Sequence, residues 1–234
     1  MNHGHPIIVF ALFPGVTQLD FTGPHQVFSS LSGARVILGS AAGGAIETAG
    51  ITFAGLYRLA DIPACDVLCV PGGAGVTDNA IGDPVFLGEL RRLAATARYI
   101  TSVCTGSLAL GAAGLLRGKR AACHWAWRDL LAPFGAIADS GRVVRDGNVI
   151  TGGGVTAGID FAFAVVAELA GPETAQAIQL QIEYAPAPPF NAGEPETAPP
   201  AILERVRERN ASAAARRREA VAAAAGRLAA IAAS

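Results

Sequence analysis

Four short apolar runs, each ending in small or turn-forming residues, constrain the fold of this chain most strongly. They cover residues 7–13 (IIVFALF), 35–40 (RVILGS), 66–70 (DVLCV) and 99–103 (YITSV). Continuous apolar runs of this length are typical of strands that are buried on both faces. Helical patterns follow them at 17–31, 84–97 and 107–116. Strands that alternate with helices predict an α/β fold, with a mostly parallel central sheet between two helical layers.

The remaining segments add elements to this sheet. Asp146-Gly147 separates two β-rich runs within residues 142–151, which predicts a hairpin. Short extended pieces are expected at 46–53 and a short helix at 125–134. The glycine triplet 152–154 opens a long helix through residue 170, and a further helix ends near residue 183.

The chain has 234 residues, which suggests one domain of residues 1–200 with an appendage at 201–234. A proline-rich strap at 185–200 joins the two. The appendage has 14 alanines and seven arginines against three glutamates, a net charge of +4, so the first 200 residues carry −5. Alanine and arginine favour helices, so we expect a helical or disordered, solvated tail.

Composition argues against several classes of protein. Charged residues make up 16% of the chain and the net charge is −1, so the chain lacks the excess of positive charge that is typical of nucleic-acid-binding proteins. No window approaches the ~20 strongly apolar residues of a membrane-spanning helix. The first residues lack the basic segment of a secretory signal. We therefore expect a cytoplasmic protein that binds neither nucleic acid nor membrane.

The four cysteines form no CxxC pair, so neither a disulfide framework nor a structural zinc site is expected. Cys65, Cys69 and Cys123 are interpreted as small buried side chains. Cys104 differs, because small residues stand two before it (Ser102) and two after it (Gly106).

This spacing at Cys104 is typical of a nucleophile elbow, a sharp turn between a strand and a helix that pushes one side chain outward. A helix N-terminus next to the sulfur is expected to lower the pKa of the thiol. The Thr105 N–H is placed to face a developing negative charge.

Two other strand ends point to the same edge of the sheet. Asp20 follows the first run, while Gly72 and Gly73 follow the third. Open parallel sheets bind ligands beyond the carboxyl ends of their strands. We therefore expect Asp20, these glycines and Cys104 to lie together.

Several motifs together resemble the ThiJ/PfpI superfamily of class I glutamine-amidotransferase-like domains. They are 13–15 (FPG), 18–24 (QLDFTGP), 70–73 (VPGG), 102–106 (SVCTG), 124–125 (HW) and 152–160 (GGGVTAGID). Residues 181–184 (QIEY) and 188–193 (PPFNAG) are similar to the isonitrile hydratase subfamily within it. The resemblance covers about residues 6–200.

The resemblance implies a flavodoxin-like three-layer sandwich, a homodimer, and an enzyme without metal or organic cofactor. It implies that Cys104 is the nucleophile, Asp20 the acidic residue beside it, and Thr105 the residue that follows at the elbow. Gly153, Val155 and Thr156 match the start of a helix that lies along the active site.

The implied reaction adds water to an isonitrile, a small-molecule substrate, to give an N-substituted formamide. We expect Cys104 to form a thioimidate and Asp20 to act as general acid and base, with a pKa raised by burial. Backbone N–H groups near Gly72, Gly73 and Thr105 are expected to stabilise anionic intermediates.

Three questions stay open at this stage. A glyoxalase-like or amidase-like cysteine enzyme would use the same site with another substrate. A thiol-based sensor or regulator would use it without turnover, although the tail is too short and featureless for a helix-turn-helix DNA reader. His124 is either a second catalytic group or a structural residue at a helix start.

Overall fold

The computed structural model describes residues 5–233, and its core is an eight-stranded sheet in the order β3-β4-β2-β1-β5-β6-β10-β9. Its central strands are parallel neighbours. They are β2 (Arg35–Ser40), β1 (Ile7–Leu12), β5 (Val67–Val70), β6 (Tyr99–Val103) and β10 (Val149–Gly152). The mostly parallel sheet predicted from the apolar runs is confirmed.

Hairpins close both edges of this sheet. The predicted turn at Asp146-Gly147 joins β9 (Val143–Asp146) to β10, and Gly147 has a positive φ of 64°. At the other edge, β3 (Gly44–Thr48) and β4 (Ile51–Arg58) form an antiparallel pair. A small second sheet pairs β7 (Arg120–Ala122) with β8 (Ile137–Asp139), and its three-residue strands were too short to predict.

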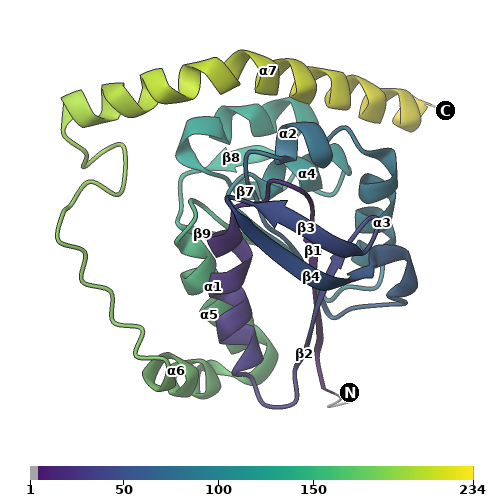
Figure 1. The fold of residues 1–234 in the computed structure, drawn as a ribbon, viewed down its shortest axis with the longest axis vertical. Helices are drawn as coiled ribbons and strands as arrows, with labels where there is room; N and C mark the ends of the chain where they lie inside the picture. Colours follow the sequence, from purple (N-terminus) through teal and green to yellow (C-terminus); the bar gives the residue numbers. More distant parts are fainter. Residues whose placement is uncertain (1–4, 234) are drawn as a thin grey trace.

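Helices cover both faces of the sheet, so the three layers are also confirmed (Figure 1). One layer holds α1 (Gln18–Ser29), α5 (Ala157–Ala170) and α6 (Pro172–Gln181). The other holds α3 (Pro84–Ala94) and α4 (Gly106–Ala112), with the short α2 (Val76–Asn79) near them. The 3-10 helices are η1 (Leu59–Asp61) and η2 (Trp125–Phe134).

Aromatic side chains join β1 to the helical layer that carries Asp20. Phe10 on β1 contacts Phe21 and Phe28 of α1, at ring-centroid distances of 6.4 and 6.0 Å. Phe28 meets Phe161 of α5 edge-on at 6.1 Å. Burial of these rings favours one position of α1 against the sheet, and thereby the position of its first turn.

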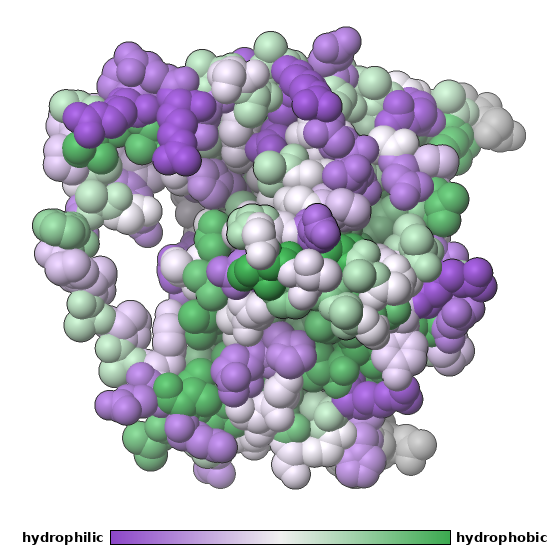
Figure 2. All heavy atoms as spheres, in the orientation of Figure 1, coloured by the Kyte–Doolittle hydropathy of each residue, from purple (hydrophilic) through white to green (hydrophobic). Residues whose placement is uncertain are grey.

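The C-terminal segment is a single helix, α7 (Pro200–Ala233), which lies across one end of the sandwich (Figure 1). The expectation of a solvated tail is wrong for one of its faces, because Val221 and Ala224 are 1% and 3% exposed. This face packs against α2, α4 and η2, while charged residues occupy much of its outer side (Figure 2). Alanine allowed this close packing although it buries little area per residue.

An extended strap at 185–199 connects α6 to α7 along one side of the molecule, and open space separates part of it from the body (Figure 2). Most of its residues are exposed. Among the described residues, no helix combines the length and apolarity that crossing a membrane requires.

Candidate active site

Cys104 occupies the sharp turn between β6 and α4 that its small neighbours predict. Its φ of 59° is one of three positive values among the described non-glycine residues. A Cβ on Gly106 would lie 2.0 Å from the Val70 carbonyl oxygen, so only glycine fits there. A left-handed cysteine in a tight strand-to-helix turn is strained backbone of the kind found at functional sites.

A buried hydrogen-bond network fixes the residues on both sides of the elbow. The hydroxyls of Ser102 and Ser107 lie 2.8 Å apart, and Ser107 donates to the Ala122 carbonyl. Ala122 in turn donates its N–H to the Thr151 hydroxyl at 2.7 Å. The network ties the start of α4 to β7, and so brings Cys123 to the side of Cys104.

Asp20 lies in the first turn of α1 and is fully buried. Its Oδ2 accepts the Gly72 N–H at 2.9 Å, whereas Oδ1 has no hydrogen-bond partner among the described residues. Burial raises the pKa of this carboxyl to about 7, while the Gly72 N–H and the neighbouring Cys104 thiol oppose the rise. Asp20 therefore lies next to Cys104, as the positions of the strand ends predict.

The expected lowering of the Cys104 pKa is wrong. Burial, the neighbouring Asp20 charge and Cys123 raise the pKa of this thiol well above its usual value, and the Thr105 N–H opposes them. The helix that follows has only seven residues, so its dipole lowers the pKa of Cys104 by less than desolvation raises it. As the pH rises, Asp20 loses its proton before Cys104 does.

Consequently the two groups hold one proton between them over a wide range above pH 7. The carboxylate can take the proton of its thiol neighbour without a change in the total charge. The pair can therefore form a thiolate by internal proton transfer, without loss of a proton to solvent.

Gly72 and Gly73 approach the site closely, but their N–H groups are directed elsewhere than expected. The Gly72 N–H holds Asp20, and the Gly73 N–H donates to the Thr105 hydroxyl at 2.9 Å. Neither is open toward a substrate in this arrangement. A Cβ on Gly72 would lie 2.4 Å from the Thr105 nitrogen and 3.0 Å from Asp20 Oδ2, so the glycine is required for the contact.

A cavity of about 400 Å³ opens beside the elbow. Gly153, Val155 and Thr156 line it, as the sequence predicts for the start of the helix along the site, although α5 itself begins at Ala157. Cys104 and Asp20 are not in its wall. Cys123 is in the wall and also interacts with the Cys104 thiol, so it adjoins both the cavity and the elbow.

His124 lines the same cavity and has a structural role. Its Nδ1 accepts the Ala126 N–H at 3.3 Å at the start of η2, and its ring stacks on Trp125. Burial and the charges of Arg217 and Arg128 lower its pKa, so the ring is neutral near pH 7. Among the described residues, His124 makes no hydrogen bond to Cys104 or Asp20.

Three parts of the cavity wall escaped the sequence analysis, one of which is residues 140–142 before β9. Arg128 lies one helical turn beyond His124, and Gly193–Glu196 belongs to the strap. The strap had a usable signal, because residues 188–193 match the isonitrile hydratase subfamily. Arg128 had no such sequence signal, since a single arginine in a short helical pattern indicates no particular site.

The other cysteines fit the expected inert role. Cys65, Cys69 and Cys123 are buried, and burial raises the pKa of each to about 12. Among the described residues, no group of three or more His, Cys, Asp or Glu side chains is arranged to hold a metal ion.

The model of the DJ-1/PfpI family matches residues 7–168. A curated isonitrile hydratase from Pseudomonas putida is 51% identical over 222 residues, which cover 94% of this chain and 97% of that protein. The match thus includes the strap and most of α7.

Solved structures agree with this relationship. A ThiJ/PfpI family protein from Pseudomonas syringae is 41% identical and superposes with a TM-score of 0.88, over 95% of this chain and 91% of the other. DJ-1beta from Drosophila melanogaster is 25% identical with a TM-score of 0.68, over 78% of this chain and all of the other.

Proposed function

We propose that this chain, which belongs to the DJ-1/PfpI family, is an isonitrile hydratase that forms N-substituted formamides. The identity of 51% to a curated isonitrile hydratase over nearly the whole of both chains supports the substrate class. The observation that carries the chemistry is the buried pair of Asp20 and Cys104, in which the carboxyl pKa of about 7 suits proton transfer near neutrality.

The first step uses both members of this pair. Asp20 takes the thiol proton, and the Cys104 sulfur attacks the terminal carbon of the isonitrile, R–N≡C. An S–C bond forms, and the carbon takes the proton back from Asp20. The product is a thioimidate, R–N=CH–S–Cys104, in which the carbon has received one nucleophile and one proton.

The second step consumes water. Water adds to the thioimidate carbon while Asp20 takes one of its protons and passes it to the nitrogen, which leaves a hydroxyl on the carbon. Asp20 then takes the hydroxyl proton as the C=O bond forms and the S–C bond breaks, and it gives this proton to the sulfur, which leaves as the thiol. The sum of both steps is R–NC plus water giving R–NH–CHO, and the enzyme is unchanged.

The hydrogen bond from Gly72 supports the role of Asp20. It occupies Oδ2, while Oδ1 has no hydrogen-bond partner among the described residues, so the carboxyl has one oxygen available for proton exchange. A carboxyl held in this way needs no reorganisation between the two steps, which favours the transition state.

Turnover of an aliphatic isonitrile to its formamide, followed by mass spectrometry, tests the proposal. Wild type should form the formamide, Cys104→Ala should form none, and Asp20→Asn should lose about 10²–10⁴-fold in rate. Cys65→Ala is the matched control, because it removes a buried thiol that precedes the amino end of β5, whereas the elbow lies at the carboxyl ends of the strands. Consumption of methylglyoxal without formamide would favour the glyoxalase-like alternative instead.

The expected homodimer and cytoplasmic location remain predictions. Light scattering after size-exclusion chromatography measures the first, and cell fractionation measures the second.

A further inference from the structure

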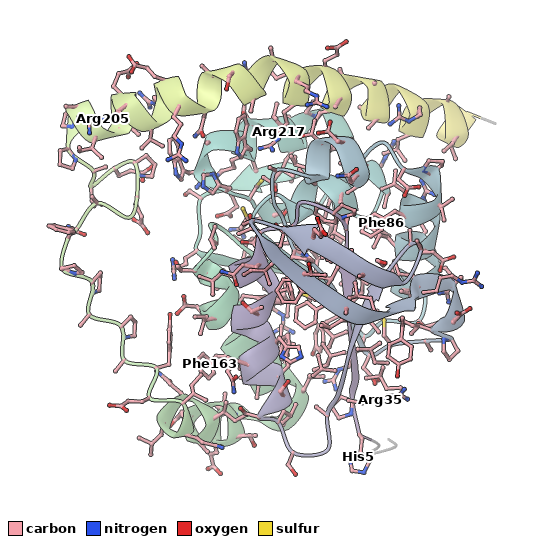
Figure 3. The ribbon with its side chains drawn as sticks, viewed as in Figure 1. His5, Arg35, Phe86, Phe163, Arg205 and Arg217 are labelled. Carbon is pink, nitrogen blue, oxygen red and sulfur yellow. The ribbon has the colours of Figure 1, made fainter. Side chains whose placement is uncertain are left out.

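Helix α7 carries one buried arginine. Arg217 is 5% exposed, while the other six arginines of this helix are exposed to solvent. Figure 3 shows Arg217 between α7 and the body of the molecule, whereas Arg205 lies near the outer end of the helix. A charged side chain is costly to bury unless the protein supplies partners for it.

Two contacts hold the guanidinium of Arg217. Its Nε donates to the Thr77 hydroxyl at 3.0 Å, and its central carbon lies 4.2 Å from the centre of the Trp127 ring. The salt bridges found among the described residues include none to Arg217; the one between α7 and α2 joins the exposed Arg216 to Asp78. The charge of Arg217 is therefore fixed in position but not neutralised by a carboxylate.

The position of Arg217 is defined by the segments that build the site. Thr77 belongs to α2, which follows the Gly72-Gly73 turn, and Trp127 belongs to η2, which follows Cys123 and His124. Helix α7 also packs on α4, which begins two residues after Cys104. The guanidinium thus contacts the segments that continue from the Gly72-Gly73 turn and from Cys123, and the helix that carries it packs on the one that continues from Cys104.

We propose that Arg217 is a positioning residue for Cys104. Its fixed positive charge acts across the water-poor interior and stabilises the thiolate form of the Cys104 side chain. The reaction places a negative charge on the sulfur beside a carboxyl, in surroundings that solvate it poorly. A nearby charge that does not need to reorganise stabilises such an anion more strongly than it would in water. Arginine suits this role because it stays protonated when buried.

A thiolate at Cys104 needs such a compensating charge. Cys104 faces Asp20 from α1 and Cys123 after β7, both of which disfavour its ionisation. Arg217 faces the thiols of Cys104 and Cys123 and, on α2, Asp78. His124, Arg128 and Asp129 complete the group near Cys123. Burial lowers the pKa of Arg217, and the anionic forms of its neighbours oppose this.

The inference rests on the proposed function only in taking Cys104 as the reactive residue. Its test therefore measures thiol reactivity rather than hydration: the rate of Cys104 alkylation by iodoacetamide between pH 6 and 10, resolved by peptide mass spectrometry. Removing the charge in Arg217→Met should move the profile upward by about one pH unit, equal to roughly tenfold slower alkylation on its rising limb. Arg217→Lys keeps the positive charge, so its profile should lie close to that of the wild type.

Arg218→Met is the control, since Arg218 neighbours Arg217 but is exposed, and it should leave the profile unchanged. Thermal unfolding accompanies each variant. If Arg217→Met proves too unstable, Arg217→Gln carries the test, because it keeps a donor for Thr77 without the charge.

Folded Met or Gln variants with the wild-type profile would overturn the inference. An equal shift in the Lys variant would do the same, because the effect would then follow packing rather than charge. Alkylation that depends on Arg217 in a protein without hydratase activity would refute the proposed function and leave the inference intact.

Discussion

The Gly72 amide donates to Asp20 Oδ2 across 2.9 Å, which joins the end of β5 to the first turn of α1. This bond brings a carboxyl from one helical layer to a cysteine that lies between β6 and α4. Burial then raises the pKa of Asp20 to about 7. The ionisation of this pair therefore depends on three strand ends together, and each contribution can be tested separately.

The pH dependence of turnover should follow Asp20. Below about pH 7 both Asp20 and Cys104 are protonated, so no base is available to take the thiol proton. We expect kcat/KM for an aliphatic isonitrile to rise with pH through an apparent pKa near 7 and then level off. The residual activity of Asp20→Asn should lack this step. A wild-type profile that is flat between pH 5 and 8 would contradict the assignment.

The raised pKa of Asp20 also has a cost in stability. Its folded-state pKa of about 7 lies above the usual 3.8, so between these values the folded protein binds more protons than the unfolded chain. Stability from this group is therefore present at low pH and lost as pH rises toward 7. Asp20→Asn should raise the free energy of unfolding at pH 8 by a few kcal/mol at most, and by much less at pH 4. Denaturant unfolding at both pH values measures the difference; an equal effect at both would refute the linkage.

Gly72→Ala should damage the site by direct contact. The new Cβ would lie 2.4 Å from the Thr105 nitrogen and 3.0 Å from Asp20 Oδ2, and backbone cannot move away as a flexible side chain could. We expect a loss of about 1–3 kcal/mol in stability together with a fall in kcat. Gly88→Ala in α3 is the matched control, because a Cβ there meets nothing within 4 Å. It should stabilise the helix by about 0.5–1 kcal/mol without changing kcat.

Thr105→Val should measure what the Thr105 hydroxyl contributes to stability, because valine keeps the shape of the side chain but lacks the hydroxyl. The Thr105 hydroxyl accepts the Gly73 N–H at 2.9 Å in a buried position, so valine leaves that donor unpaired. The expected cost is about 1–3 kcal/mol in the free energy of unfolding. Thr105→Ser keeps the oxygen and should retain most of the stability. Equal unfolding midpoints for the Val and Ser variants would show that the hydrogen bond contributes little.

Much of the fold follows from local patterns in the chain. The apolar runs at 7–13, 35–40, 66–70 and 99–103 became central strands, because burial on both faces demands continuous hydrophobicity whatever the partner strand is. The hairpin at Asp146-Gly147 and the elbow at Cys104 were predictable for a similar reason. Each depends on backbone conformations that only certain small or polar residues adopt at low cost.

Tertiary contacts decided what these local patterns could not. Desolvation reversed the expected lowering of the Cys104 pKa, and hydrogen bonds within the protein took up the Gly72 and Gly73 amides. The alanine-rich segment docked and carried Arg217 to Thr77 and Trp127. Sequence spacing determines which groups reach one edge of the sheet. Their ionisation and hydrogen-bond partners depend on side chains that lie far apart in the sequence, and only the folded arrangement brings those together.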